Sequence, residues 1–295
     1  MTDLAAPPAA AAGPRAPSDR LALAGLLSVP ALFVVVLSIV PIVLLLQISF
    51  AHRIPGGLWA PGLELTQYAQ LFDPLFLRVA AFSIGLAVVT AVISVGLAFP
   101  TAYYITRMRR RAQVAWLVCL LGALSLSEVL IVFAFQVLLS GSGGLVKALV
   151  TVGLMPAAHS LYPNTAAVVT CLVYLVLPYI ILFLYPALSR LDDDMQAAAA
   201  TMGASPVRGF LTVVVPMMRG PILSACMLVV VFTVGSYLTP LVLGRPQQWT
   251  IGVHISNAAL TTGNLPLAAA QAVALVALML GLLAAVRRLT GKAAA

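Results

Sequence analysis

The sequence predicts an all-α membrane protein with six transmembrane helices. Of its 295 residues, 62% are hydrophobic and 8% are charged, and the mean hydropathy is +1.09. A soluble domain, by comparison, averages about 25% charged residues. Six apolar runs each come close to the roughly 20 residues that a helix needs to cross a bilayer. Lys and Arg are concentrated on one side of the topology that these runs define.

The N-terminal part combines a polar tail with a long apolar run. Residues 1–20 are rich in Ala and Pro, and we expect a disordered tail there. The run at 21–50 is longer than the about 7–15 residues of a signal-peptide core, so we expect it to remain as the first transmembrane helix. Residues 21–295 then form one transmembrane domain with its core at about 75–286. Residues 51–74, rich in Pro and Gly, are expected to form an extended loop.

The next three helices are expected at 75–106, 113–140 and 165–188. The second of these ends where Gly and Ser dominate the sequence at 141–144. A short amphipathic piece at 145–154 is expected to lie at the membrane surface.

The last two helices are expected at 222–243 and 265–286, with a loop at 244–264 between them. Gly235 and Pro240 fall inside the fifth helix. They permit either a local break, where freed carbonyls line a cavity, or a simple kink. A loop at 192–216 is the longest interruption of the apolar second half.

The basic residues fix the orientation of this topology. One side holds twelve of them and the other holds four, Arg53, Arg78, Lys147 and Arg245. By the positive-inside rule the first side is cytoplasmic. Both termini and the 192–216 loop are therefore expected in the cytoplasm. The twelve are Arg15, Arg20, Arg107, Arg109, Arg110, Arg111, Arg190, Arg208, Arg219, Arg287, Arg288 and Lys292.

Several classes of function do not fit the composition. The sequence has no basic soluble module, which argues against nucleic-acid binding. It has no GxxxxGK[ST] phosphate loop, so we expect no nucleotide site in this chain. Cys119, Cys171 and Cys226 all lie in apolar runs and suit small core residues better than disulfides or metal ligands. We expect no metal or other cofactor.

The 192–216 loop has the local pattern of two short helices with a sharp turn between them. The three aspartates at 192–194 suit a helix N-terminus, and the following stretch to residue 202 is rich in Ala. Gly203 can adopt the left-handed conformation that ends a helix. Ser205 and Pro206 then suit the N-cap and first position of a second helix.

The spacing in this loop resembles the EAA loop of ABC-transporter permeases, which is Glu-Ala-Ala, three residues, Gly, nine residues and Ile-x-Leu-Pro. Here Ala197 replaces the Glu, and Val213 and Val215 replace the Ile and Leu. The resemblance implies that this loop docks into a cleft on an ATP-hydrolysing subunit, and that the missing Glu removes one charged contact. The implied coupling residues are Asp194, Ala197, Ala198, Ala199, Gly203, Ala204, Ser205 and Pro216.

The resemblance covers most of residues 25–285. GSYLTPLVLG, at 235–244, and NLPLAAAQAVAL, at 264–275, resemble permeases of the spermidine/putrescine importer group. That resemblance implies a MetI-like permease fold in a bacterial inner membrane. It also implies a pair of ATPase subunits that bind ATP and Mg, a binding protein outside, and a second permease, a paralogue in preference to a second copy. The solute is expected to be a polyamine or a related cation, and iron, thiamine, opines and phosphonates remain alternatives.

Glu128 is the only ionisable residue near the middle of a predicted span. A charge at the bilayer centre costs about 2.5–3.5 kcal/mol on insertion scales, so it needs a partner or a wet cavity. The functional interpretation is a cation site on the translocation path. The alternatives are a hydrogen bond to a neighbouring helix or a protonated acid.

Further candidates for the path are aromatic and polar residues of the same spans. Aromatic rings add cation–π surface, although on membrane helices they also face lipid or pack against each other. The candidates are Phe133, Gln136, Tyr174, Ser236 and Tyr237, with Phe135 as a further aromatic.

Two other classes of function compete with an importer subunit. A self-sufficient carrier or channel would need more membrane-embedded ionisable residues for ion coupling than this sequence has. A membrane enzyme would need paired carboxylates, a His cluster or a nucleophile–base pair at one depth, and the predicted spans bring none together.

Overall fold

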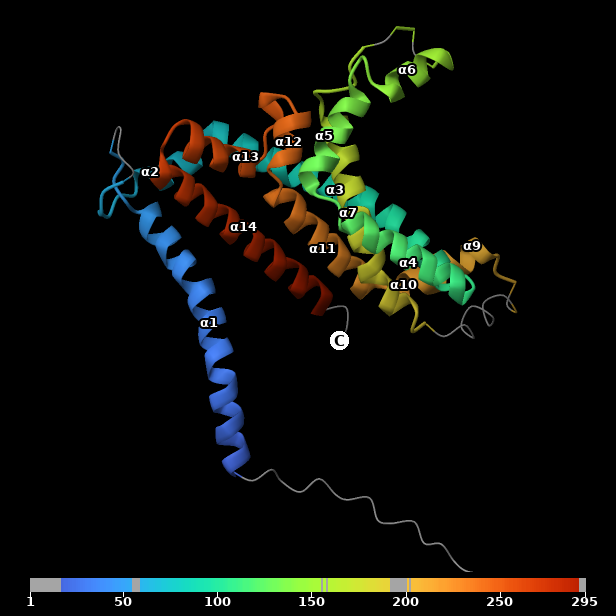
Figure 1. Ribbon diagram of the computed structural model, residues 1–295, viewed down its shortest axis with the longest axis horizontal. Coiled ribbons are helices and arrows are strands. Elements are labelled where there is room, and N and C mark those ends of the chain that lie inside the picture. Colours follow the sequence, from blue (N-terminus) through green and yellow to red (C-terminus); the bar gives the residue numbers. More distant parts are fainter. Residues whose placement is uncertain are drawn as a thin grey trace, which may run out of the picture. The chain divides into compact units, whose positions relative to one another are not determined.

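The structure is a computed structural model, and it describes residues 17–54, 59–154, 156–157, 159–191, 201 and 203–291. Within this part of the chain the elements are helical, which confirms the predicted fold class, and the one extended contact is an isolated bridge between His52 and Ala60. The elements (Figure 1) are α1 (Pro17–Ser49), α2 (Thr66–Ala69), η1 (Gln70–Phe72), α3 (Pro74–Thr106), α4 (Arg110–Leu124), α5 (Glu128–Leu139), α6 (Gly144–Thr151), α7 (Thr165–Leu188), α9 (Pro206–Gly209), η2 (Phe210–Val214), α10 (Val215–Met217), α11 (Arg219–Gly235), α12 (Leu238–Leu243), η3 (Pro246–Gln248), α13 (Ile251–Ser256), η4 (Asn257–Thr261) and α14 (Leu265–Gly291).

Five helical stretches of the described residues are long and apolar enough to cross a membrane. They are Leu32–Ser49, Pro74–Thr106, Glu128–Thr151, Thr165–Leu188 and Leu265–Ala285. A sixth results if Pro206–Met217 and Arg219–Gly235, which meet at an angle of 75°, are counted as one bent span. The predicted six spans therefore match the upper of the two counts.

The predicted continuous helix at 113–140 is wrong. The chain forms α4 and α5 instead, with a break at Ser125–Ser127. The Ser125 hydroxyl donates a hydrogen bond to the Leu121 carbonyl at 3.1 Å, and Ser127 is extended, with φ −64° and ψ 133°. Serine side chains that bond to a preceding turn weaken the helix at that point.

The predicted continuous helix at 222–243 is also divided, into α11 and α12, so that the local break suggested by Gly235 and Pro240 is present at Ser236–Tyr237. Pro240 has no N–H with which to bond the carbonyl four residues earlier, that of Ser236. The Thr250 hydroxyl donates to this carbonyl instead, at 2.8 Å.

Two regions that were expected to be loops contain helices. Residues 244–264 form η3, α13 and the π-helix η4, and residues 51–74 contain α2 and η1. Their segments are too short to give a clear helical periodicity in the sequence, and tertiary contacts stabilise them. The amphipathic piece expected at 145–154 is present as α6.

The chain divides into two compact units, residues 1–47 and 48–295. The described part of the first unit belongs to α1, which starts at Pro17. Apolar side chains of this helix, such as Leu32 and Phe33, are exposed. Exposed apolar side chains suit a helix that has lipid as its solvent. The predicted tail at 1–20 lies mostly outside the described residues.

The core of the second unit is built on α3, α7 and α11, which lie side by side (Figure 1). One face of α3 carries small buried residues at a spacing of three or four, which allows close helix approach in a membrane. Leu184 and Leu188 of α7 belong to the buried hydrophobic cluster that contains Ala91, Ala98 and Ala102 of α3. A second cluster joins α5, α7 and α12. The small buried residues of α3 are Ala87, Ala91, Ser94, Ala98 and Ala102.

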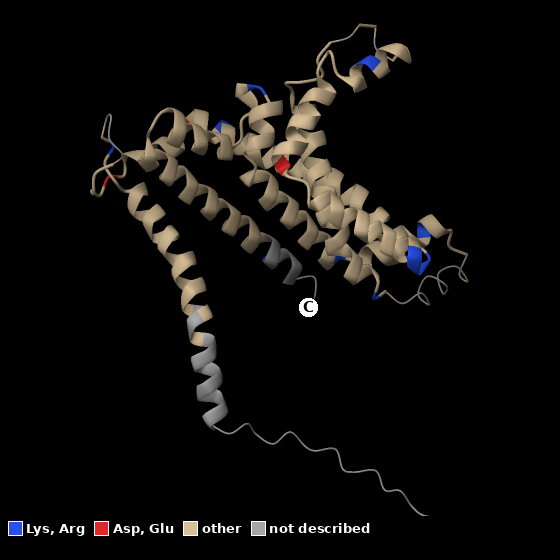
Figure 2. Cartoon of the chain, viewed as in Figure 1, with Lys and Arg blue, Asp and Glu red and all other residues tan. Residues whose placement is uncertain are grey.

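The second unit has two ends of different character. At one end, which we call the Arg-rich end, Arg107, Arg109, Arg110 and Arg111 lie where α3 ends and α4 begins. There Gln113 donates to the Thr106 carbonyl at 2.9 Å and accepts from the Tyr185 hydroxyl at 3.3 Å. At the opposite end the backbone N–H of Asn164 donates to the Leu243 carbonyl at 3.0 Å, and Arg245 donates to that of Pro163, also at 3.0 Å. Lys and Arg lie near these ends and not along the long apolar stretches between them (Figure 2).

Candidate functional site

The described half of the predicted coupling loop has the local geometry that its sequence indicates. Gly203 has a φ of +83°, in the left-handed region. The Ser205 side chain caps α9 by accepting from the Arg208 N–H at 3.3 Å, and Pro206 is at the first position. Ala204 is partly buried, whereas Pro216 is exposed. Asp194, Ala197, Ala198 and Ala199 lie outside the described residues.

Some side chains of the segment from Pro206 to Met217 pack on the bundle, and others are exposed. The Phe210 ring lies 5.3 Å from that of Phe99 and 5.0 Å from that of Tyr103, both on α3. Val214 and Met218 join the core cluster of α7 and α11. A force on this segment would therefore reach all three core helices through packed side chains.

The same segment also exposes apolar side chains. Val207 is 68% exposed, Leu211 57% and Met217 46%. An apolar face on short helices at the Arg-rich end, beside an arginine, suits a protein partner better than lipid tails.

Glu128 does not lie in the middle of a helix, as the sequence had suggested, but is the first residue of α5 beside the α4–α5 break. The Glu128 side chain is exposed at the surface of this chain. The helix α12 packs on both α5 and α7. The carboxylate thus lies beside the α4–α5 break, in the first turn of α5, where the helix dipole favours negative charge.

The α11–α12 break forms the second irregular point of the bundle. Ser236 is buried, and its hydroxyl has no hydrogen-bond partner among the described residues. Tyr237 is 38% exposed and lines a cavity of about 150 Å³, which we call the Tyr237 cavity. Leu241 of α12, Trp249 at the end of η3, and residues of α13 and η4 form its remaining walls.

Three contacts hold the helix α13 in position beside this break. Thr250 binds the Ser236 carbonyl, and the Ile251 N–H donates to the hydroxyl of Ser83 on α3 at 3.0 Å. Gly252 allows the closest approach, since a Cβ atom there would lie 2.9 Å from the Ser236 carbonyl oxygen and 3.3 Å from that of Gly235. Thr250 and Gly252 thus place α13 on the break, and Ile251 fixes it to α3.

We expect Gly252→Ala to lower the stability of the protein and to disturb the Tyr237 cavity. The added methyl group has to push α13 away from the backbone of the break, and overpacking typically costs about 1–3 kcal/mol. Thermal unfolding of the purified protein in detergent measures the effect. The matched control is Gly281→Ala in α14, where a Cβ meets nothing within 4 Å. In a helix this change should stabilise by about 0.5–1 kcal/mol. Equal unfolding temperatures for the two variants would contradict the close approach.

The remaining path candidates lie on α5 and α7, outside the Tyr237 cavity. Phe133 and Tyr174 are about half exposed, and Gln136 is partly buried. The Tyr174 ring packs on that of Phe135 at 5.4 Å, which is the packing alternative raised by the sequence. Glu128, Phe133, Gln136 and Tyr174 do not line the Tyr237 cavity.

Comparison with known proteins decides the family. Residues 98–292 match the sequence profile of a family described as the inner membrane component of binding-protein-dependent transport systems. The match includes both breaks and the segment Pro206–Met217. This chain belongs to that family.

Individual permeases are similar over most of this permease's length. The spermidine/putrescine transport system permease protein PotB of Haemophilus influenzae is 26% identical over 241 residues, which cover 82% of this chain and 84% of the relative. PotB of Escherichia coli K12 is 24% identical over 239 residues, 81% and 87% of the two chains. The inner membrane ABC transporter permease protein YdcU of the same strain is 28% identical over 241 residues, 78% and 77%.

Solved structures share the fold of this permease. A crystal structure of a bacterial ABC transporter involved in import of the acidic polysaccharide alginate gives a TM-score of 0.70 at 14% identity, covering 93% of this chain and 96% of the other. The alginate transporter in complex with its pentasaccharide-bound periplasmic protein gives 0.71, over 93% and 95%. The MetI-like permease fold expected from the sequence is confirmed.

The sequence reasoning missed the part of the permease that holds the α11–α12 break. The sequence predicts a loop at Thr250 and Gly252, and no local pattern identifies these two residues as neighbours of Ser236. The one signal in the sequence is Pro240, because a proline leaves the carbonyl four residues earlier without its helical N–H donor. The identity of that donor depends on the fold.

Proposed function

We propose that this permease is the membrane-spanning subunit of an ATP-driven importer for a polyamine or a related small organic cation. The observation that carries the proposal is the similarity to spermidine/putrescine permeases over about four fifths of both chains. The Glu128 carboxylate beside the α4–α5 break supports it, because a fixed negative charge at membrane depth lowers the free energy of a passing cation.

In this proposal an ATPase subunit docks on the segment 192–216. The apolar surface of Val207, Leu211 and Met217 supports this, as does the packing of Phe210 on α3. Closure of the ATPase pair would move the segment and tilt the helices packed on it between two states of the bundle. A second permease, a paralogue in preference to a copy of this chain, completes the core, and the binding protein docks at the opposite end.

The proposal places the Arg-rich end and both termini in the cytoplasm. The support is the charge asymmetry of twelve to four in the sequence. A cysteine introduced at exposed Ser205 should react with a membrane-impermeant maleimide only after the cells are opened. Labelling of this position in intact cells would reverse the assigned orientation.

A transport assay of the assembled complex tests the solute. The complex, purified through a tag on this chain and reconstituted with its binding protein, should take up labelled putrescine or spermidine in an ATP-dependent and saturable way. Thiamine, a phosphonate and a neutral sugar serve as comparison solutes. ATP-dependent uptake of one of these without polyamine uptake would replace the cationic assignment, and uptake without any ATPase would overturn the importer itself.

A further inference from the structure

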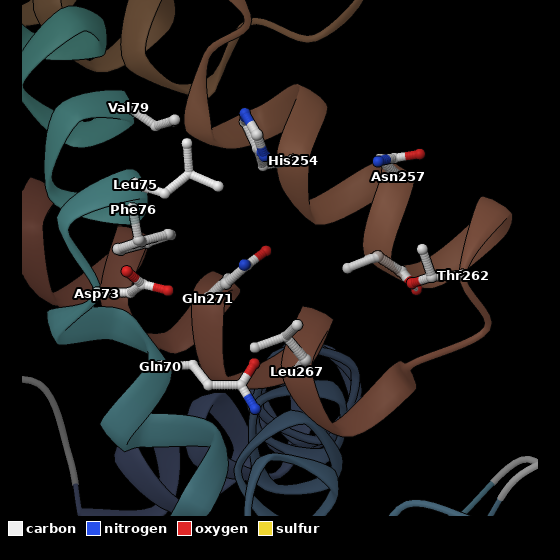
Figure 3. Close-up of a pocket in the computed structure, with 11 residues that line it drawn as sticks. Gln70, Asp73, Leu75, Phe76, Val79, His254, Asn257, Thr262, Leu267 and Gln271 are labelled. Atoms are coloured by element: carbon white, nitrogen blue, oxygen red, sulfur yellow. Dashed lines mark hydrogen bonds between the residues drawn. The ribbon is translucent and has the colours of Figure 1, made fainter.

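A second cavity, of about 220 Å³, lies at the end of the bundle opposite to the Arg-rich end (Figure 3). We call it the Asp73 cavity. It is larger than the engineered apolar cavity of about 150 Å³ that binds benzene, so it has room for a small organic molecule. Its walls come from η1, the start of α3, α13, η4 and the start of α14.

One wall of the Asp73 cavity carries a buried acceptor that the fold leaves unused. Gln271 of α14 is 8% exposed, and its Oε1 has no hydrogen-bond partner among the described residues. The side-chain amide extends into the cavity toward α13 (Figure 3). A buried carbonyl oxygen without a donor costs about 1–3 kcal/mol, so a ligand with a donor group would recover that free energy.

The rim of the same cavity carries a carboxylate that the fold does not use either. Asp73 is the N-cap of α3, but its side chain makes no capping hydrogen bond. No ion pair with Asp73 occurs among the described residues, and Figure 3 shows its carboxylate on the side of the cavity where Gln271 enters. The two acceptors face one volume from different helices.

The other groups around the cavity favour a cation with an alkyl chain. Burial lowers the pKa of His254 from its ordinary value, which favours the neutral imidazole in the wall. The Arg53 guanidinium donates to the Thr262 carbonyl at 3.4 Å, and neither Arg53 nor Arg78 of α3 lines the cavity. Leu75, Phe76 and Leu267 supply apolar surface between the polar groups.

We propose that the Asp73 cavity binds the protonated amino group of a small alkylamine, with Asp73 as the counter-ion, Gln271 as a hydrogen-bond acceptor and the apolar wall along the alkyl chain. The proposal does not depend on which solute is transported. Asn257 lines both this cavity and the Tyr237 cavity, so a bound amine would lie against their shared wall.

The test measures binding of n-butylammonium to the full-length protein in lipid nanodiscs by ligand-observed NMR titration. Butylammonium should bind saturably, while 1-butanol and butyrate should bind weakly or not at all. Asp73→Asn and Gln271→Met should each weaken binding roughly tenfold or more, since a hydrogen bond to a charged group is worth about 1.5–3 kcal/mol. The absence of a capping bond from Asp73 means that Asp73→Asn removes no contact from α3.

The matched control is Glu64→Gln, at a carboxylate that pairs with His52 and does not line the cavity. It should bind butylammonium as the unaltered protein does. Unchanged affinity in both Asp73→Asn and Gln271→Met, preferential binding of butyrate, or no saturable binding would each overturn the proposal. If one variant fails to fold, the other decides. Polyamine uptake by the assembled complex is a separate measurement and distinguishes failure of this site from failure of the proposed function.

Discussion

Gly203→Val is expected to uncouple ATP hydrolysis from transport while the protein stays inserted and assembled. Gly203 has a φ of +83°, and an L-residue in the left-handed region costs about 1–2 kcal/mol, more if it is β-branched. A Cβ atom at this position meets no atom of the described residues within 4 Å, so the expected effect comes from the backbone. The chain relieves the strain by changing the turn, which changes the angle at which α9 leaves it.

The effect of Gly203→Val on coupling should be large, because the segment Pro206–Met217 is short and packs on the core helices. Phe210 holds it on α3, and a strain of about 1–2 kcal/mol shifts an equilibrium between two orientations by roughly 5- to 30-fold. We expect ATPase activity in the reconstituted complex to persist, with solute taken up per ATP reduced by about tenfold.

A matched control is available in the same region. A Cβ atom added at Gly220, near the start of α11, also meets no atom within 4 Å, but the backbone there is helical and not left-handed. Gly220→Val should therefore leave coupling intact. Normal uptake per ATP in Gly203→Val, with both variants assembled, would show that Gly203 is not the pivot of this segment.

Glu128→Gln is expected to reduce uptake of a cationic solute severely, by about tenfold or more, while basal ATPase activity and assembly persist. The substitution keeps the shape and hydrogen-bonding capacity but removes the charge beside the α4–α5 break. Two opposite charges 4 Å apart attract by about 1 kcal/mol in water and about 4 kcal/mol near a protein surface. Uptake assays with the reconstituted complex, at solute concentrations below half-saturation, measure the loss.

The conservative variant separates this role from a structural one. Glu128→Asp keeps the charge and shortens the reach, so it should retain more uptake than Glu128→Gln. A structural carboxyl would give another pattern, in which Gln is tolerated and bulky apolar residues destabilise the bundle. Near-normal uptake of polyamine by the Gln variant would remove Glu128 as the cation site.

The sequence alone determined the apolar spans and the local geometry around residues 203–206. The helix predicted at 165–188 is α7, and that predicted at 75–106 differs from α3 by one residue. Ser205 and Pro206 begin α9, and Gly203 takes a positive φ, as expected. These features follow from neighbouring residues, because lipid requires about 20 apolar residues per span, and caps and turns depend on backbone groups a few positions away.

Only the tertiary structure decided where the irregular points lie and what meets there. The Ser236 carbonyl is bound by Thr250, fourteen residues on, and Gly252 is needed because α13 packs on the Ser236 backbone. Asp73 and Gln271 enter one cavity from helices almost two hundred positions apart in the chain. A carbonyl freed by proline, or an amide buried without a donor, leaves no periodic trace in the sequence. Its partner is fixed by packing between distant segments.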